Sequence, residues 1–170
     1  FRSADLPGGG HSAHIVDLTD ADQTAKLVDA VMAKHGRLDA FVNAAAVLIV
    51  QPFLDVDPKS WARTLEVNTT GTFFIAQAVA RYMVKHGGGQ IVLIASNVGR
   101  VPRINNSSYA ASKAAVIHLA RCMAMELGPQ GVSVNALCPG STATSMLVAN
   151  QAGGDPSRLD GIIKGSIAQW

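Results

Sequence analysis

Three residues in the middle of the chain could act together on a hydroxyl or carbonyl group. Tyr109 and Lys113 are four residues apart in a segment with helical spacing, so their side chains lie on one helix face. Free tyrosine has a pKa of about 10, and a nearby ammonium lowers it by favouring the phenolate. The pair could therefore act as a general acid and base, although the same spacing also occurs on ordinary helix surfaces. Ser96 ends an apolar, strand-like run thirteen residues before Tyr109 and could place a hydroxyl in the same cleft.

The segments that must position these residues alternate between strand-like and helix-like patterns. The predicted strands are residues 14–17, 38–42, 90–96 and 132–138, and the predicted helices run from a Thr19 cap to Gly36 and over residues 59–85 and 108–127. This alternation favours one α/β domain over residues 1–170, with a parallel sheet covered by helices on both faces. Such sheets bind ligands at the carboxyl ends of their strands, where the chain carries Asn43, Ser96 and Pro139-Gly140.

Composition narrows the class of protein. Hydrophobic residues make up 48% of the 170 residues and charged residues 15%, which is typical of a globular chain. The net charge of +2 is too small and scattered for a nucleic-acid surface. No apolar stretch approaches the roughly 20 residues that cross a bilayer. Cys122 and Cys138 form neither a disulfide framework nor a metal-ligand cluster, so we expect two reduced core residues, no metal, and a cytoplasmic setting.

Five segments in order resemble the short-chain dehydrogenase/reductase family over nearly the whole chain. Ser96, Tyr109 and Lys113 match its catalytic core, and Asn68 in Glu66-Val67-Asn68 matches the asparagine that completes its tetrad. The other matching segments are Asp17, Asn43-Ala44-Ala45-Ala46, and the run from Asn135 through Pro139-Gly140-Ser141-Thr142 to Thr144. Ala46 stands where the family has glycine, a departure that would crowd that loop.

The resemblance implies an NAD(P)-dependent oxidoreductase that transfers hydride between nicotinamide and a hydroxyl or carbonyl carbon. It implies that Tyr109 exchanges a proton with the substrate oxygen, that Ser96 stabilises that oxygen, and that Lys113 lowers the tyrosine pKa. It assigns to Asn68 a helix irregularity and a water that links Lys113 to solvent. The implied cofactor-binding residues are Asp17, Asn43, Ala44, Ala45, Tyr109, Lys113, Pro139, Gly140, Thr142 and Thr144.

The implied fold is a Rossmann-like doubly wound parallel sheet in three αβα layers. Neither Gly8-Gly9-Gly10 nor Gly87-Gly88-Gly89 forms the glycine-rich turn that binds a pyrophosphate, so both are predicted to be loops. By the family's register, the first βαβ segment lies upstream of Phe1 and a C-terminal strand and lid lie beyond Trp170. The residue that selects NAD or NADP is therefore not readable here.

Within the family, the chain resembles 2,3-dihydro-2,3-dihydroxybenzoate dehydrogenases of siderophore biosynthesis. The resemblance rests on Val101-Pro102-Arg103-Ile104 before Tyr109 and on the segment from Pro139 to Met146. It implies substrate contacts from Ser96, Arg103, Tyr109 and Met146, with the Arg103 guanidinium holding a carboxylate. Arg103 could equally be a solvated loop charge, and Arg100 could play the same part. Because the product of this reaction is aromatic, we favour NAD as the oxidant.

Other readings stay open. The chain could be another short-chain dehydrogenase, such as a 3-oxoacyl thioester reductase or a cis-dihydrodiol dehydrogenase, because specificity lies in loops. It could also be a non-catalytic protein that binds a nucleotide or a partner, although Asn68, Ser96, Tyr109 and Lys113 are all present. Residues 72–83 and 114–125 are apolar over more than one helix face, which indicates a homodimer or homotetramer built on these helices.

Overall fold

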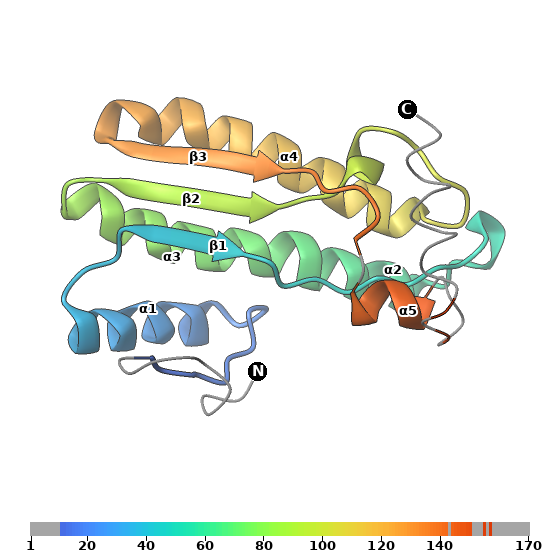
Figure 1. The fold of residues 1–170 in the computed structure, drawn as a ribbon, viewed down its shortest axis with the longest axis horizontal. Coiled ribbons are helices and arrows are strands. Elements are labelled where there is room, and N and C mark those ends of the chain that lie inside the picture. The colour runs from blue at the N-terminus through green and yellow to red at the C-terminus, as the bar shows by residue number, and fades with distance from the viewer. Residues whose placement is uncertain (1–10, 143, 151–154, 156, 158–170) are drawn as a thin grey trace.

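A computed structural model describes residues 11–142, 144–150, 155 and 157 of the chain. Three parallel strands form one sheet in the order β1 (Ala40–Asn43), β2 (Gly89–Ile94) and β3 (Val132–Leu137) (Figure 1). Phe41 pairs with Ile91, and Ile91 pairs with Val134, so the strands are in register and their carboxyl ends meet at one edge. The predicted α/β fold with a parallel sheet is confirmed.

Helices α3 (Thr72–Lys85) and α4 (Ser107–Leu127) cover one face of the sheet, and α1 (Ala21–His35) packs on α3 beyond the β1 edge (Figure 1). Helix α2 (Pro58–Leu65) precedes α3, and a short α5 (Ser145–Asn150) lies beyond the carboxyl end of β3. The crossovers from β1 to β2 and from β2 to β3 advance in the same direction, and right-handed crossovers of one direction put their helices on the same side. The described residues therefore show two of the three expected layers.

The hydrophobic core lies between the sheet and helices α3 and α4. The largest buried side chains there are at most 2% exposed, and they come from β2, α3 and α4: Ile91, Leu93, Ile75, Met83 and Val116. Burying each such side chain contributes about 1.5–3 kcal/mol relative to leaving it in water. This core holds α4, the helix of Tyr109 and Lys113, against the strands that precede Ser96.

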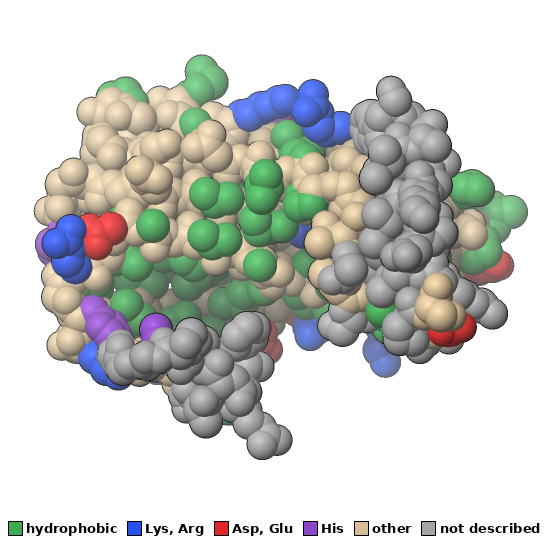
Figure 2. All heavy atoms as spheres, viewed as in Figure 1, with side chains coloured by type: hydrophobic (Ala, Val, Ile, Leu, Met, Phe, Trp, Pro, Cys, Tyr) green, Lys and Arg blue, Asp and Glu red, His purple; other side chains and the backbone are tan. Residues whose placement is uncertain are grey.

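The opposite face of the sheet is open to solvent in the described part of the chain. Side chains alternate along a strand, so Val42, Ile94 and Leu137 point away from the helices. Val42 is 59% exposed and Leu137 54% exposed. Figure 2 views this face and shows apolar side chains gathered over the sheet. The sheet thus has an apolar face with no cover among the described residues.

The predicted elements are found with shifted ends, except for one strand. Residues 14–17 form no strand, because no described segment lies beside them to accept their backbone hydrogen bonds. Helix α1 is capped by Asp20 rather than Thr19, since the Asp20 carboxylate accepts from the backbone N–H groups of Asp22 and Gln23. The helix ends before Gly36, as predicted, and Gly36 caps it in the left-handed conformation at φ 73°.

Gly87 and Gly88 form the predicted loop between α3 and β2, whereas Gly89 is already the first residue of β2. A Cβ on Gly88, whose φ is 104°, would lie 2.3 Å from the carbonyl oxygen of Gly131, so this turn packs directly on the turn before β3. Gly8-Gly9-Gly10 lie outside the described residues.

Both cysteines are free; Cys138 is partly buried and packs against the core, but Cys122 is exposed, so the prediction of a core position is wrong for Cys122. Cys122 lies on the outward side of α4, where the apolar spacing of the helix does not extend. None of the helices in the described ranges is long and apolar enough to cross a membrane.

Candidate active site

The structure brings Ser96 and Tyr109 together at the carboxyl end of the sheet. Ser96 follows β2 and caps a 3₁₀ turn at Asn97–Gly99, while Tyr109 lies in the first turn of α4. Both line a cavity of about 100 Å³. The predicted substrate contacts Arg103 and Met146 line the same cavity, as do Gly140 and Thr144 of the predicted cofactor segment.

Five residues that sequence reasoning did not select also line this cavity: Leu48, Asn97, Val98, Asn106 and Ser141. Asn97, Val98 and Ser141 are immediate neighbours of predicted residues, so their positions follow once the strand ends are known. Leu48 and Asn106 come from loops, where no periodic pattern marks the residues that face inward.

Burial raises the pKa of the Tyr109 phenol, and a side-chain hydrogen bond with Ser96 opposes that rise. This direction is the opposite of the one expected from Lys113. The Lys113 ammonium lies 5.7 Å from the centroid of the Tyr109 ring and donates a hydrogen bond of 2.8 Å to the carbonyl oxygen of Ile94. The ammonium is thus bound to the strand, and without other groups in the cleft the neutral phenol is the favoured form.

Lys113 is itself buried, with 3% of its surface exposed. Burial lowers the pKa of its ammonium to about 8, because a charged group loses solvation in the interior. One hydrogen bond to Ile94 leaves two of its three N–H donors for another ligand. Lys113 is therefore a cationic donor held at the strand end, close to but not bonded to the phenol.

Asn68 lies in a π-helical segment, Glu66–Gly71, that joins α2 to α3, which confirms the predicted helix irregularity. Its side chain is fully buried and is bound on both sides by the backbone of Val47, accepting from N at 2.8 Å and donating to O at 2.9 Å. The amide also donates to Ser112 Oγ at 3.0 Å. Asn68 thus ties the loop after β1 to α4 through side-chain contacts.

A chain of buried hydrogen bonds extends from β1 to the turn that carries Tyr109. Asn43 donates to Thr72 Oγ1 at 2.8 Å, and Thr72 donates to the Asn68 carbonyl at 2.7 Å. At the other end, Ser112 Oγ donates to the Tyr109 carbonyl at 2.7 Å. Sequence reasoning missed Thr72 and Ser112, because polar residues inside apolar helices carry no periodic signal of their own.

Gly99 lets the turn after Ser96 pack directly on α4. A Cβ at this position would lie 2.8 Å from the carbonyl carbon of Lys113 and 2.8 Å from the nitrogen of Ala114. Any side chain there would push the turn off the helix, so glycine at this position determines how closely Ser96 approaches Tyr109.

The remaining predicted cofactor residues lie at strand ends or in surface loops. Ala44 and Ala45 are exposed after β1, and Thr142 Oγ1 donates to the Gly140 carbonyl at 3.4 Å. Pro139 is partly buried, and its carbonyl accepts from the backbone of Asn97 at 3.0 Å. Asp17 accepts from the N–H and hydroxyl of Thr19 and does not line the Tyr109 cavity. These hydrogen bonds lower the Asp17 pKa, the backbone bond most.

The two candidate arginines are separated by the structure. Arg103 lines the cavity of Ser96 and Tyr109, whereas Arg100 lines neighbouring cavities beside Cys138. Among the described residues, no group of three or more histidine, cysteine or acidic side chains could hold a metal ion.

A family model of the short-chain dehydrogenases matches residues 6–154. D-threitol dehydrogenase of Mycolicibacterium smegmatis is 36% identical over 81% of this chain and 53% of its own. 2,3-dihydro-2,3-dihydroxybenzoate dehydrogenase of Escherichia coli is 38% identical over 79% and 54%, and a 3-oxoacyl-[acyl-carrier-protein] reductase of Thermotoga maritima is 35% identical over 78% and 54%. The chain thus spans about half the length of these curated relatives.

Solved structures show the same fold. A gluconate 5-dehydrogenase from Burkholderia cenocepacia in complex with NADP and tartrate superposes with a TM-score of 0.76 at 33% identity, over 78% of this chain and 52% of that one. An NAD⁺-bound xylitol dehydrogenase gives a TM-score of 0.81 at 30% identity, over 90% and 64%. With the family model covering most of the residues and the tetrad in its expected elements, the chain belongs to the short-chain dehydrogenase/reductase family.

Proposed function

We propose that this chain carries the catalytic part of an NAD(P)-dependent oxidoreductase that acts on a hydroxyl or carbonyl carbon. The observation that carries the proposal is the cavity that Ser96 and Tyr109 line together, where the Ser96 side chain opposes the rise in the pKa of the phenol. The buried ammonium of Lys113 lies within about 6 Å of the centre of that phenol ring, and two of its three N–H donors are available to a ligand.

The residues present fit a nicotinamide cofactor. Lys113 has two uncommitted N–H donors for ribose hydroxyls, and Gly140 and Thr144 lie on the same cavity as Tyr109. Asn43, Ala44, Ala45, Pro139 and Thr142 would border the cofactor at the strand ends, and Asp17 would lie on its adenine side. The cofactor, when bound, supplies or accepts the hydride.

The chain's own residues manage the proton at the substrate oxygen. The neutral phenol of Tyr109 donates a proton to an oxygen that gains charge during reduction, and the phenolate takes that proton back during oxidation. Ser96 donates a hydrogen bond to the same oxygen and stabilises its developing charge. Asn68 acts through Ser112 and Val47 to hold the helix turn that carries both Tyr109 and Lys113.

The substrate that we favour is 2,3-dihydro-2,3-dihydroxybenzoate, oxidised to 2,3-dihydroxybenzoate with NAD in siderophore biosynthesis. Arg103 is the charged residue among those that line the cavity, and it takes no part in the ion pairs Arg37–Asp39 and Arg63–Glu66 of the described chain. It is therefore placed to bind the carboxylate of such a substrate. The relative from Escherichia coli with this printed activity supports the choice.

A 3-oxoacyl thioester reductase is the second candidate, supported by the relative from Thermotoga maritima. A thioester carries no carboxylate at the reacting end, so this activity leaves Arg103 without a partner in the cavity. A non-catalytic nucleotide-binding protein is less well supported, because the structure retains the contacts of all four tetrad residues.

The complete protein tests the proposal through the absorbance of reduced nicotinamide. Addition of NAD and 2,3-dihydro-2,3-dihydroxybenzoate should produce it, and Tyr109→Phe should lower turnover by at least about 10²-fold, the low end for a general acid or base. Tyr82→Phe, at the chain's other tyrosine, should keep turnover. Near-normal turnover in Tyr109→Phe rejects the catalytic assignment, and activity confined to NADPH and a 3-oxoacyl thioester supports the second candidate instead.

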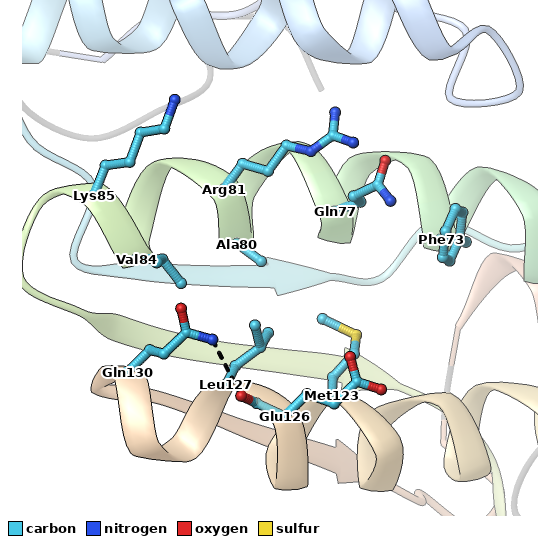
Figure 3. A pocket seen from close by; sticks show the side chains of 10 residues that line it. All are labelled: Phe73, Gln77, Ala80, Arg81, Val84, Lys85, Met123, Glu126, Leu127 and Gln130. Atoms are coloured by element: carbon cyan, nitrogen blue, oxygen red, sulfur yellow. Dashed lines mark hydrogen bonds between the residues drawn. The ribbon is translucent and has the colours of Figure 1, made fainter.

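We also propose that the enzyme is a homodimer or homotetramer that assembles through α3 and α4 in the cytoplasm. A groove of about 390 Å³ lies between these helices, with Phe73 and Val84 on one side and Met123 and Leu127 on the other (Figure 3). Phe73 is 41% exposed. Because a two-fold axis presents the same surface on both subunits, the equivalent helices of a second copy would cover this groove.

A further inference from the structure

The side chain of Asn106, at the start of α4, does not make the hydrogen bond expected of a helix cap. The residue occupies the N-cap position of α4, where an asparagine oxygen normally accepts a hydrogen bond from the first turn. Its side chain makes no such bond, and only 7% of the residue is exposed. Its amide donates instead to the carbonyl of Ile104 at 2.8 Å, and the residue lines the cavity that contains Tyr109.

These contacts fix which way the amide faces. A carbonyl oxygen only accepts, so the NH₂ group of Asn106 must be the end that meets Ile104. The amide oxygen Oδ1 is then the end left for another partner. A hydroxyl is a suitable partner, because it can donate, whereas a carboxylate cannot.

The backbone around Asn106 is held as tightly as its side chain. Its carbonyl accepts from Ala110 at 2.7 Å, which anchors it to α4. Asn105, before it, has the left-handed φ of 60° and accepts from the backbone of Gln51 at 3.0 Å. Asn106 is therefore a preorganised acceptor three residues from Tyr109, in a cavity whose charged lining residue is Arg103.

We propose that Asn106 determines specificity by accepting a hydrogen bond from a second hydroxyl of the substrate, next to the one that reacts. Arg103 binds the carboxylate, Tyr109 and Ser96 bind the reacting oxygen, and Asn106 recognises the neighbouring one. The substrate class is then a compact carboxylate with two adjacent hydroxyls. This inference rests on the proposed function, and it adds a polar contact that a simple alcohol or a 3-oxoacyl group would leave unpaired.

Calorimetric binding of four carboxylates to the whole protein tests it: benzoate, 2-hydroxybenzoate, 3-hydroxybenzoate and 2,3-dihydroxybenzoate. The unaltered protein should bind the dihydroxy acid most tightly. Asn106→Leu, in which the new side chain is similar in size but has no acceptor, should lower the affinity for 2,3-dihydroxybenzoate by about 2- to 10-fold, which corresponds to one neutral hydrogen bond. The affinity for benzoate should stay unchanged. Arg103→Ala should weaken all four acids by about tenfold or more.

Matched controls separate these effects from general damage. Arg100→Ala removes a guanidinium outside the cavity, and Asn135→Leu makes the same exchange at an exposed position of β3, so both variants should bind the acids like the unaltered protein. Asn106→Ala serves if the leucine variant does not fold, as judged by thermal unfolding.

Equal weakening of benzoate and 2,3-dihydroxybenzoate by Asn106→Leu overturns the proposal, as does equal binding of all four acids by the unaltered protein or no binding of any. None of these results bears on Tyr109, whose role is measured by turnover. Failure of the specificity assignment is thus distinguishable from failure of the oxidoreductase assignment.

Discussion

At the scale of single residues, the site holds Tyr109, the proposed acid/base group, in its neutral state. Burial raises the pKa of Tyr109 and lowers that of Lys113 to about 8, so at neutral pH the phenol is protonated and the amine is charged. The charge on Lys113 is directed to the Ile94 carbonyl at 2.8 Å rather than to the phenol. Spacing along a helix indicated that the two residues are neighbours, but their burial decides the direction of each pKa.

This state of Tyr109 can be measured directly, because the chain has two tyrosines. In a Tyr82→Phe variant, the ultraviolet absorbance of tyrosinate reports Tyr109 alone, and its midpoint should lie above about pH 10, the value of free tyrosine. Lys113→Met should leave that midpoint unchanged in the protein without cofactor. A midpoint below 10 that rises in Lys113→Met would show that the ammonium controls the phenol.

The same shift has a consequence for stability. The folded pKa of Tyr109 lies above the unfolded value, so the neutral phenol contributes to folding below about pH 10. That contribution is lost as the pH rises through the folded pKa. The free energy of unfolding of the Tyr82→Phe variant should therefore fall in this alkaline range, and a Tyr82→Phe/Tyr109→Phe variant should lack that part of the decrease.

At the scale of elements, the position of the turn that carries Tyr109 depends on irregularities at the ends of helices and strands. The π-helical segment Glu66–Gly71 places Asn68 between the loop after β1 and α4, and Gly99 lets the turn after β2 touch α4. Single-turn π segments often occur at functional sites, because they aim a side chain that a regular helix would place elsewhere. The π-helical segment and the glycine-containing turn therefore position the site as much as the regular helices and strands do.

Thr72→Val tests the buried chain of hydrogen bonds at this scale. The exchange keeps the shape but removes the hydroxyl that accepts from Asn43 and donates to Asn68, leaving buried groups without that partner. We expect a loss of about 1–3 kcal/mol in the free energy of unfolding, measured by denaturant titration. Thr70→Val, at an exposed threonine of the same segment, should change it by less than about 0.5 kcal/mol. Equal effects of the two variants would contradict a stabilising network.

At the scale of the whole molecule, two apolar surfaces have no cover among the described residues. One is the open face of the sheet with Val42 and Leu137 (Figure 2), and the other is the groove between α3 and α4 (Figure 3). Large uncovered apolar patches mark interaction surfaces more often than free ones. The groove has equivalent helices to meet in a second copy, so we attribute it to assembly.

Phe73→Glu tests this assignment. A carboxylate at this lining position would be buried without a partner if a second copy covered the groove, so the mass in solution should shift toward the monomer. Met125→Glu is the matched control, because Met125 is also an exposed apolar residue of these helices, at 81%, but does not line the groove. Light scattering after gel filtration gives both masses. An unchanged mass for Phe73→Glu, or an equal shift for both variants, would place the subunit contact elsewhere.

The sequence alone determined the class of fold and the order of the main elements, and its resemblance to the family supplied the four proposed tetrad residues. Strand and helix periods are local properties of a chain, so the main elements and the ends of β2 and β3 could be located without coordinates. The assignments of Asn68 and Lys113 came from the resemblance to the family. The prediction of a strand over residues 14–17 was wrong, because a strand needs a neighbouring strand to pair with. The predicted cap of α1 was also wrong, since Asp20 caps the helix and not Thr19.

Only the tertiary structure decided which residues share a cavity and in which direction each pKa moves. Arg100 and Arg103 are alike in sequence, yet the loop turns one of them toward Tyr109 and the other away. Thr72, Ser112 and Asn106 gain their roles from hydrogen-bond partners in other parts of the chain or from the cavity that they line. Cavities, burial and desolvation depend on contacts between segments far apart along the chain, which no local pattern records.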